Sequence, residues 1–157
     1  MADFTFGDWK LTPEGKRYFD EINKLADMEV AVGFQSGQDP YEDGTDLVTV
    51  VAYNELGTSD IPARPFMKQS WDNHQDELRG ICEQALASVA SGGSADSAAK
   101  KMGAFGVGLI QKEIVDGTFK PNKPSTIRKK GSDKPLIDTG HMRQSVKYVV
   151  RKAGDST

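Results

Sequence analysis

The sequence has one cysteine, two histidines and no long apolar run, and each shortage excludes a class of protein. A lone cysteine, Cys82, cannot form an intramolecular disulfide, which fits a chain made in a reducing cytoplasm. Its position on a helical apolar stripe predicts a small core residue. The apolar runs fall far short of the roughly 20 residues that a membrane-spanning helix needs, and no secretory signal is visible. We therefore expect a soluble protein with no membrane partner.

Patterns typical of enzymes are also scarce. Glu55 has no second carboxylate, histidine or metal-ligand spacing beside it, so we interpret it as a structural hydrogen-bonding residue. With only His74 and His141 in the chain, a histidine metal site is improbable, and His74 is expected at the edge of the core. We expect no metal.

Three glycines in a predicted helix resemble a nucleotide-binding loop only superficially. Gly103, Gly106 and Gly108 have the order G-x-x-G-x-G, whereas the dinucleotide fingerprint is G-x-G-x-x-G directly after a strand. We interpret them as small residues that allow close helix packing, with a bend or a subunit contact as the alternatives. No cofactor is expected.

The net charge of −3 conceals a strong asymmetry along the chain. Residues 1–80 carry 7 basic and 16 acidic side chains, and residues 81–157 carry 13 basic and 7 acidic ones. Such a division suits head-to-tail contact between copies, or an acidic partner at the basic end. Two solvated faces would explain it equally well.

The spacing of apolar residues predicts an α+β fold in a single domain, 1–157. A small antiparallel sheet is expected to pack against a long helical hairpin, with extended loops. Phe4, Phe6 and Trp9 predict an edge strand, or an arm lying on a neighbouring subunit, over residues 1–10. The predicted helices are 13–26, 66–89 and 94–117, the predicted strands are 28–34 and 146–152, and a polar loop covers 35–45. Residues 46–55 fit either a strand or a short helix.

Prolines, glycines and possible helix-capping residues are dense between Pro121 and Val149. Prolines hold the chain extended, Ser125 is expected to cap a short helix over 126–130, and Gly131 is expected to end it. Asp138 or Thr139 is expected to cap a second short helix that ends at Ser145. Gly140 is expected to let the first turn of that helix pack closely. Leu136 and Ile137 are the expected apolar anchors of this segment, which includes an extended basic loop over 118–135.

The segment 121–149, PNKPSTIRKKGSDKPLIDTGHMRQSVKYV, resembles the C-terminal signature of tailed-bacteriophage neck proteins, also called head–tail connector, tail-completion or minor tail proteins. That signature reads P-S-T-I-x-x-K-G-S-x-K-P-L-I-D-T-G-x-x-x-x-S. The segments AYNELGT (52–58) and IPARPF (61–66) are similar to the family's A-x-N-E-F-G-T and I-P-A-R-P-F, with Leu56 in place of the commoner phenylalanine. The resemblance covers roughly residues 28–152 and favours a helix over 46–55.

The resemblance implies a structural virion protein and not an enzyme, because the family offers no catalytic residues to carry over. Such a protein would form a homo-oligomeric ring in the neck, between neck proteins on the portal side and the tail side. It would be made and assembled in the host cytoplasm. The matched positions expected to have structural roles are Asn54, Glu55, Gly57, Arg64, Pro65, Asp138, Thr139 and Gly140.

The enzyme alternative is a retroviral-type aspartic protease. The sequence Leu136-Ile137-Asp138-Thr139-Gly140 matches the apolar-apolar-D-T-G pattern in which two copies supply paired carboxylates. Such proteases are almost wholly β, whereas the middle of this chain is predicted to be helical. The neck assignment is therefore favoured.

The basic loop predicts an interaction surface. We expect it to reach an acidic surface on a neighbouring subunit or neck partner. The basic residues are Arg128, Lys129, Lys130 and Lys134, and the acidic surface would be formed by Asp39, Glu42, Asp43 and Asp46. Aromatic residues are not interleaved with the basic ones, so no base-stacking platform is expected. Positive charge alone would suffice for non-specific contact with DNA in a connector channel.

Overall fold

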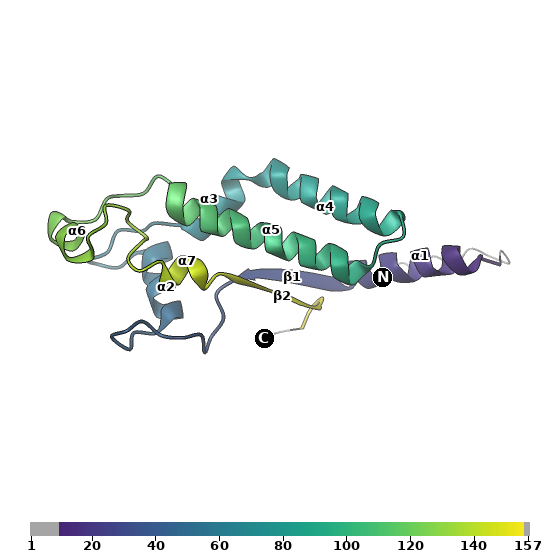
Figure 1. Cartoon of the computed structure of the whole chain (residues 1–157), viewed down its shortest axis with the longest axis horizontal. Helices are drawn as coiled ribbons and strands as arrows, with labels where there is room; N and C mark the ends of the chain where they lie inside the picture. The colour runs from purple at the N-terminus through teal and green to yellow at the C-terminus, as the bar shows by residue number, and fades with distance from the viewer. Residues whose placement is uncertain (1–9, 156–157) are drawn as a thin grey trace.

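A computed structural model describes residues 10–155, and in it the long helix α5 (Ala95–Asp116) is the axis of an α+β fold (Figure 1). The expected fold class is confirmed. Strands β1 and β2 pack along α5, and α3 and α4 pack against the same helix. Helices α1 and α6 lie at opposite ends of the molecule (Figure 1). The remaining elements are α1 (Pro13–Ala26), β1 (Met28–Gly33), α2 (Leu47–Leu56), α3 (Phe66–Asn73), α4 (Gln75–Ala90), α6 (Pro124–Lys130), α7 (His141–Gln144) and β2 (Lys147–Lys152).

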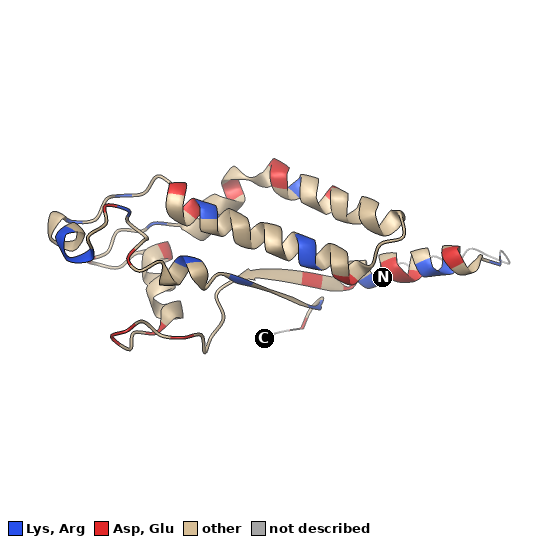
Figure 2. Cartoon of the chain, in the orientation of Figure 1, with Lys and Arg blue, Asp and Glu red and all other residues tan. Residues whose placement is uncertain are grey.

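Both predicted strands are present and pair with each other. They run antiparallel, with Met28 opposite Lys152 and Val32 opposite Tyr148. β1 comes from the acidic half of the sequence and β2 from the basic half, so the two halves are interleaved in the fold, and Figure 2 shows acidic and basic residues along the length of the molecule. The predicted arm at residues 1–10 lies almost wholly outside the described residues.

The glycines of α5 allow close packing, but the neighbour is the sheet and not another helix. A Cβ atom at Gly103 would lie 2.3 Å from the Tyr148 ring, and one at Gly106 would lie 2.9 Å from Val32. Gly108 has no such neighbour within 4 Å. Two of the three glycines therefore set the distance between helix and sheet, and α5 continues unbroken through them.

The prediction of one continuous helix over 66–89 is wrong. His74 has φ −124° and ψ 28°, which ends α3 and precedes α4. The imidazole Nδ1 contacts the Glu77 carboxylate, and Nε2 lies 3.8 Å from a carboxylate oxygen of Glu113 on α5. Apolar residues keep helical spacing across a single non-helical residue, so their periodicity did not reveal the break. Of the helices that the structure describes, α5 is the longest, with 22 residues.

The core consists of two apolar clusters. The larger joins α2, α3, α5 and the segment that contains Leu136 and Met142, and the smaller joins α4 and α5. Leu136 is buried and Ile137 packs on the larger cluster, so both expected anchors are confirmed. Cys82 was expected in the core but is exposed. None of the helices within residues 10–155 is long and apolar enough to cross a membrane.

Two of the predicted helix caps are wrong. Helix α6 begins at Pro124 after Lys123 and has no side-chain cap, so Ser125 lies inside it. Gly140, not Asp138 or Thr139, stands before α7, and its left-handed backbone at φ 82° is the reason that glycine fits there. The expected helix end at Gly131 is confirmed, with φ 69°, and Gly57 ends α2 in the same way, with φ 78°.

Candidate functional site

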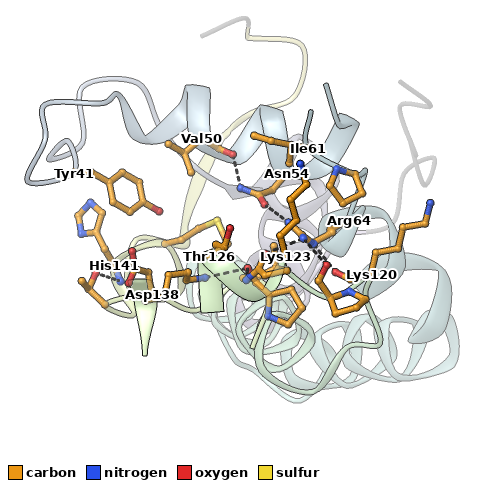
Figure 3. A pocket seen from close by; sticks show the side chains of 18 of the residues that line it. Tyr41, Val50, Asn54, Ile61, Arg64, Lys120, Lys123, Thr126, Asp138 and His141 are labelled. Carbon is orange, nitrogen blue, oxygen red and sulfur yellow. Dashed lines mark hydrogen bonds between the residues drawn. The ribbon is translucent and has the colours of Figure 1, made fainter. Parts of the chain in front are cut away.

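A cavity of about 720 Å³ lies at the α6 end of the molecule, and it brings together the two sequence segments that carry the resemblance. Residues of α2 and of the loop before α3 form one wall. The other walls are the segment before α6, α6 itself and residues 135–142. Figure 3 shows their side chains around the cavity. Segments more than fifty residues apart in sequence therefore meet at one site.

Arg64 is the central residue of this site, and only 4% of its surface is exposed. Its Nε donates to the carbonyl oxygen of Lys120 at 2.8 Å, and its Nη2 donates to Oδ1 of Asn122 at 2.9 Å. Its Nη1 donates to Oδ1 of Asn54 at 3.3 Å, on the opposite side of the guanidinium (Figure 3). No carboxylate within residues 10–155 forms a salt bridge with it. Burial lowers the pKa of Arg64 from its ordinary value.

Two side chains of the AYNELGT segment form hydrogen bonds with helix backbone, one within α2 and the other at the start of α3. Asn54 Nδ2 donates to the carbonyl oxygen of Val50 at 2.9 Å. The Glu55 carboxylate accepts from the backbone N–H of Met67 at 2.9 Å and from that of Lys68 at 3.0 Å. These are the unsatisfied donors of the first turn of α3, so Glu55 caps that helix from a distant position in sequence.

Two neighbouring residues explain why this cap is needed and how the chain reaches it. Pro65, which precedes α3, has no side-chain oxygen to cap the helix. Gly57 turns the chain at φ 78°, and a Cβ atom there would lie 2.8 Å from the backbone nitrogen of Ala63. Only glycine fits both the backbone conformation and the space. The expected structural positions from 54 to 65 therefore act together in one turn.

The opposite wall holds a second partly buried cation. Lys130 Nζ donates to the carbonyl oxygens of Pro135 at 3.3 Å and Lys134 at 3.5 Å. Burial lowers the pKa of Lys130, while the Asp138 carboxylate acts to raise it. Asp138 and Thr139 line the cavity, and Thr139 Oγ1 accepts from the His141 N–H at 3.4 Å. Asp138 therefore faces a cation in this site.

Tyr41 and His141 also line the cavity, and neither was predicted from the sequence as a site residue. Their rings meet edge to face with centroids 4.9 Å apart, and His141 Nε2 lies 2.8 Å from the carbonyl oxygen of Asp39. Burial, and then the Asp138 carboxylate, raise the pKa of Tyr41 above its ordinary value. The sequence carries no spacing signal for this contact, because more than ninety residues separate the two rings.

The predicted basic residues fall into two groups. Lys130 and Lys134 bond to carbonyl oxygens of their own chain, with Lys134 Nζ donating to Val115 at 3.2 Å. Arg128 and Lys129 are exposed on α6. Figure 2 shows the basic residues of α6 at one end of the molecule. Lys134 is exposed as well, so among the four predicted basic residues only Lys130 is partly buried, and the other three carry outward charge.

The predicted acidic residues lie on a loop near α6 of the same chain, and all four of them are exposed. Hydrogen bonds from Thr45 are the main cause that lowers the pKa of Asp43, and Lys129 adds a smaller effect. Asp46 has a local role, because its carboxylate accepts from the N–H and hydroxyl of Thr49 and so caps α2. The acidic loop and the basic helix α6 lie toward the same end of one subunit (Figure 2).

The chemistry of the site is that of a hydrogen-bonded junction between loops. The part of the chain that the structure describes has no group of three or more histidine, cysteine, aspartate or glutamate side chains that could hold a metal ion. None of the protein-family models, curated proteins or solved structures compared with the chain matches it. The function has to be argued from the site and from the sequence motifs.

Proposed function

We propose that this chain is a structural virion protein of a tailed bacteriophage, a subunit of a ring in the neck that joins the head to the tail. The observation that carries the proposal is the convergence on Arg64. This arginine belongs to the IPARPF segment, and it bonds to Asn54 of AYNELGT and to the residues that lead into PSTIRKK. The motif residues that resemble the neck family thus support one another as a single structural unit.

The buried guanidinium also fits a mechanical role. Arg64 holds the 120–122 segment against α2, so the exposed helix α6 is presented on a fixed base. Arg128 and Lys129 then point their charge into solvent, where an acidic neighbour in the ring, a neck partner or DNA phosphates would meet it. Each exposed ion pair contributes only about 0–1 kcal/mol, so this contact would orient the subunit more than hold it.

The test is genetic and is carried out in the phage that encodes the chain. A stop codon early in the gene is expected to leave DNA-filled heads and complete tails unjoined, and supply of the protein in trans is expected to restore joining. Electron microscopy of the lysate gives the readout. Normal joined particles without the protein would refute the neck assignment.

A charge-reversal variant tests the role of α6. Arg128→Glu with Lys129→Glu is expected to reduce the yield of joined particles, and more strongly at low salt than at high salt. Lys16→Glu with Lys100→Glu is a matched control, because both lysines are exposed and lie outside the cavity. Equal yields from the two double variants would remove α6 from the contact and leave the neck assignment intact.

The second candidate is an aspartic protease built from two copies, favoured only by the Leu136–Gly140 pattern. Asp138 lies near Lys130 and Tyr41 in this chain. In a protease, the Asp138 carboxylates of two copies would have to meet and share a proton. Acid-pH peptidase activity that disappears in Asp138→Asn would favour the protease, and particle joining that survives this substitution favours the structural role.

A further inference from the structure

Two cations in the walls of the cavity at the α6 end form no salt bridge with any carboxylate of residues 10–155. One is the buried guanidinium of Arg64, whose partners are amide and carbonyl oxygens. The other is the partly buried ammonium of Lys130, which donates to carbonyl oxygens. Buried charges in proteins are as a rule paired with an opposite charge. The cavity therefore has an excess of buried positive charge.

An asparagine side chain joins the two cations. Asn122 Oδ1 accepts from Arg64 Nη2 at 2.9 Å, and Asn122 Nδ2 donates to the carbonyl oxygen of Pro135 at 3.4 Å. Lys130 Nζ donates to the same carbonyl oxygen at 3.3 Å. Burial is the largest cause that lowers the pKa of Lys130, and the charge of Arg64 lowers it further. The two cations thus lie at the ends of one short hydrogen-bond chain and repel each other.

Both cations keep a hydrogen-bond donor that the described residues do not use. Four of the five N–H groups of Arg64 have acceptors, and the remaining one is on Nη1. The ammonium of Lys130 has three N–H groups and two carbonyl acceptors. A carboxylate has two oxygen atoms that accept strong bonds from such cationic donors.

Much of the remaining wall is apolar. Ile61, Leu136 and Met142 are among the residues that line it, and Val50 and Ile61 flank Asn54 in Figure 3. The cavity volume of about 720 Å³ lies within the range of roughly 300–1,000 Å³ that is typical of ligand sites. Mostly apolar walls with a few polar groups are also typical of such sites. A ligand that fits this cavity has an apolar body and an anionic group.

Asp138 limits the negative charge that the cavity accepts. It lines the same cavity as Lys130, and its charge acts to raise the pKa of that lysine. A second anion beside Lys130 is repelled by Asp138, and the repulsion grows in proportion to the charge of that anion. A singly charged carboxylate is therefore favoured over a doubly charged phosphate.

We propose that this cavity is a binding site for a carboxylate attached to an apolar body. The carboxylate binds beside Arg64 and Lys130, and the apolar part packs against the apolar wall. A free carboxylic acid and an acidic side chain of an extended partner segment share this chemistry. The site does not depend on the proposed neck role.

The test is a titration of the full-length protein followed by nuclear magnetic resonance. Phenylacetate and its neutral analogue phenylacetamide are compared at one ionic strength. The acid is expected to bind about fivefold more tightly than the amide, and to shift the side-chain amide signals of Asn54 and Asn122. Equal affinities, or shifts confined to other parts of the chain, would overturn the proposal.

Three substitutions separate the site from general surface binding. Lys130→Met should weaken binding of phenylacetate about fivefold, whereas Lys101→Met, which removes an exposed lysine of α5 outside the cavity, should not change it. Asp138→Asn should strengthen binding about threefold, because a competing carboxylate is removed. A gain in affinity cannot arise from loss of folding. An unaltered affinity in Lys130→Met, or a weaker one in Asp138→Asn, would refute the site.

Two peptides distinguish the sources of the carboxylate. Tighter binding of acetyl-Leu-Glu-Leu-amide than of phenylacetate, with no binding of its glutamine counterpart, would identify an acidic partner segment. The reverse order of affinities would identify a free acid, and both results support the site. Inorganic phosphate that binds as tightly as phenylacetate would reject the preference for a carboxylate. These measurements use purified protein and the neck assignment is tested in virions, so either can fail without the other.

Discussion

Replacement of Arg64 by alanine is expected to lower the free energy of unfolding by about 3 kcal/mol. Its two short hydrogen bonds reach Lys120 at 2.8 Å and Asn122 at 2.9 Å. A bond from a charged donor contributes roughly 1.5–3 kcal/mol, so the pair supplies about 3–6 kcal/mol. Loss of the desolvation cost of a guanidinium that is only 4% exposed offsets part of this. For a domain of this size, the melting temperature should fall by roughly 6–12 °C.

The assay is urea denaturation followed by circular dichroism, with two control variants. Arg79→Ala removes a guanidinium whose side chain is 69% exposed and whose nearest carboxylate lies 3.6 Å away, so a change within about 0.5 kcal/mol is expected. Arg64→Lys keeps the charge but not the planar set of donors, so it should recover less than half of the lost stability.

Amide exchange locates the effect of the Arg64 substitution. In Arg64→Ala, exchange should accelerate in residues 118–123, which the guanidinium holds, and not at the α1 end. A loss below about 1 kcal/mol in Arg64→Ala, with unchanged exchange in this segment, would show that Arg64 does not hold the junction.

Three further outcomes follow from single contacts. Gly103→Ala should lower the free energy of unfolding by about 1–3 kcal/mol because its Cβ would clash with Tyr148. Gly108→Ala, in open space, should raise it by about 0.5–1 kcal/mol, and thermal melts that give both changes the same sign would contradict this. Glu55→Ala should cost about 1–2 kcal/mol and accelerate amide exchange in the first turn of α3, and unaltered exchange there would exclude the cap. Burial, and then the Asp138 carboxylate, raise the pKa of Tyr41 above its ordinary value of 10.0. The contribution of the protonated Tyr41 side chain to stability is therefore present below pH 10.0 and is lost as the pH rises through the folded-state pKa. Ultraviolet titration should show a phenol that ionises above the ordinary pKa of tyrosine, and Tyr41→Phe should remove that step.

Local chemistry in the sequence is sufficient to predict most of the elements. Thr12 and Pro13 begin α1 as their residue types require, and the Thr12 hydroxyl accepts from the Gly15 N–H at 3.1 Å. Ser94 caps α5 in the same way. Alternating apolar residues give both strands, and the resemblance correctly favours a helix for α2. These features depend on neighbours within a few residues.

Features set by distant partners could not be predicted in this way. The break at His74 is accompanied by a contact with Glu113 on another helix, and the apolar spacing continues across it. Cys82 has helical spacing with core residues but faces a groove that the described residues leave unfilled. Periodicity identifies the apolar face of a helix, but it does not show whether another part of the same chain covers that face.

At the α6 end of the molecule, hydrogen bonding and backbone conformation give the motif residues structural roles. Three chain segments meet there with little regular structure, so their backbone groups need partners other than helix or sheet ladders. Those partners are the side chains of Arg64, Asn54, Asn122 and Glu55, and glycines lie where the chain has to turn. Each of these residue types is needed for its hydrogen bonds or its backbone, so substitution would disturb the loops even if nothing were bound. The same hydrogen bonds fix the position of the segment that leads into α6 relative to α2, and this is what a subunit needs if it is to present Arg128 and Lys129 to a neighbour in one orientation.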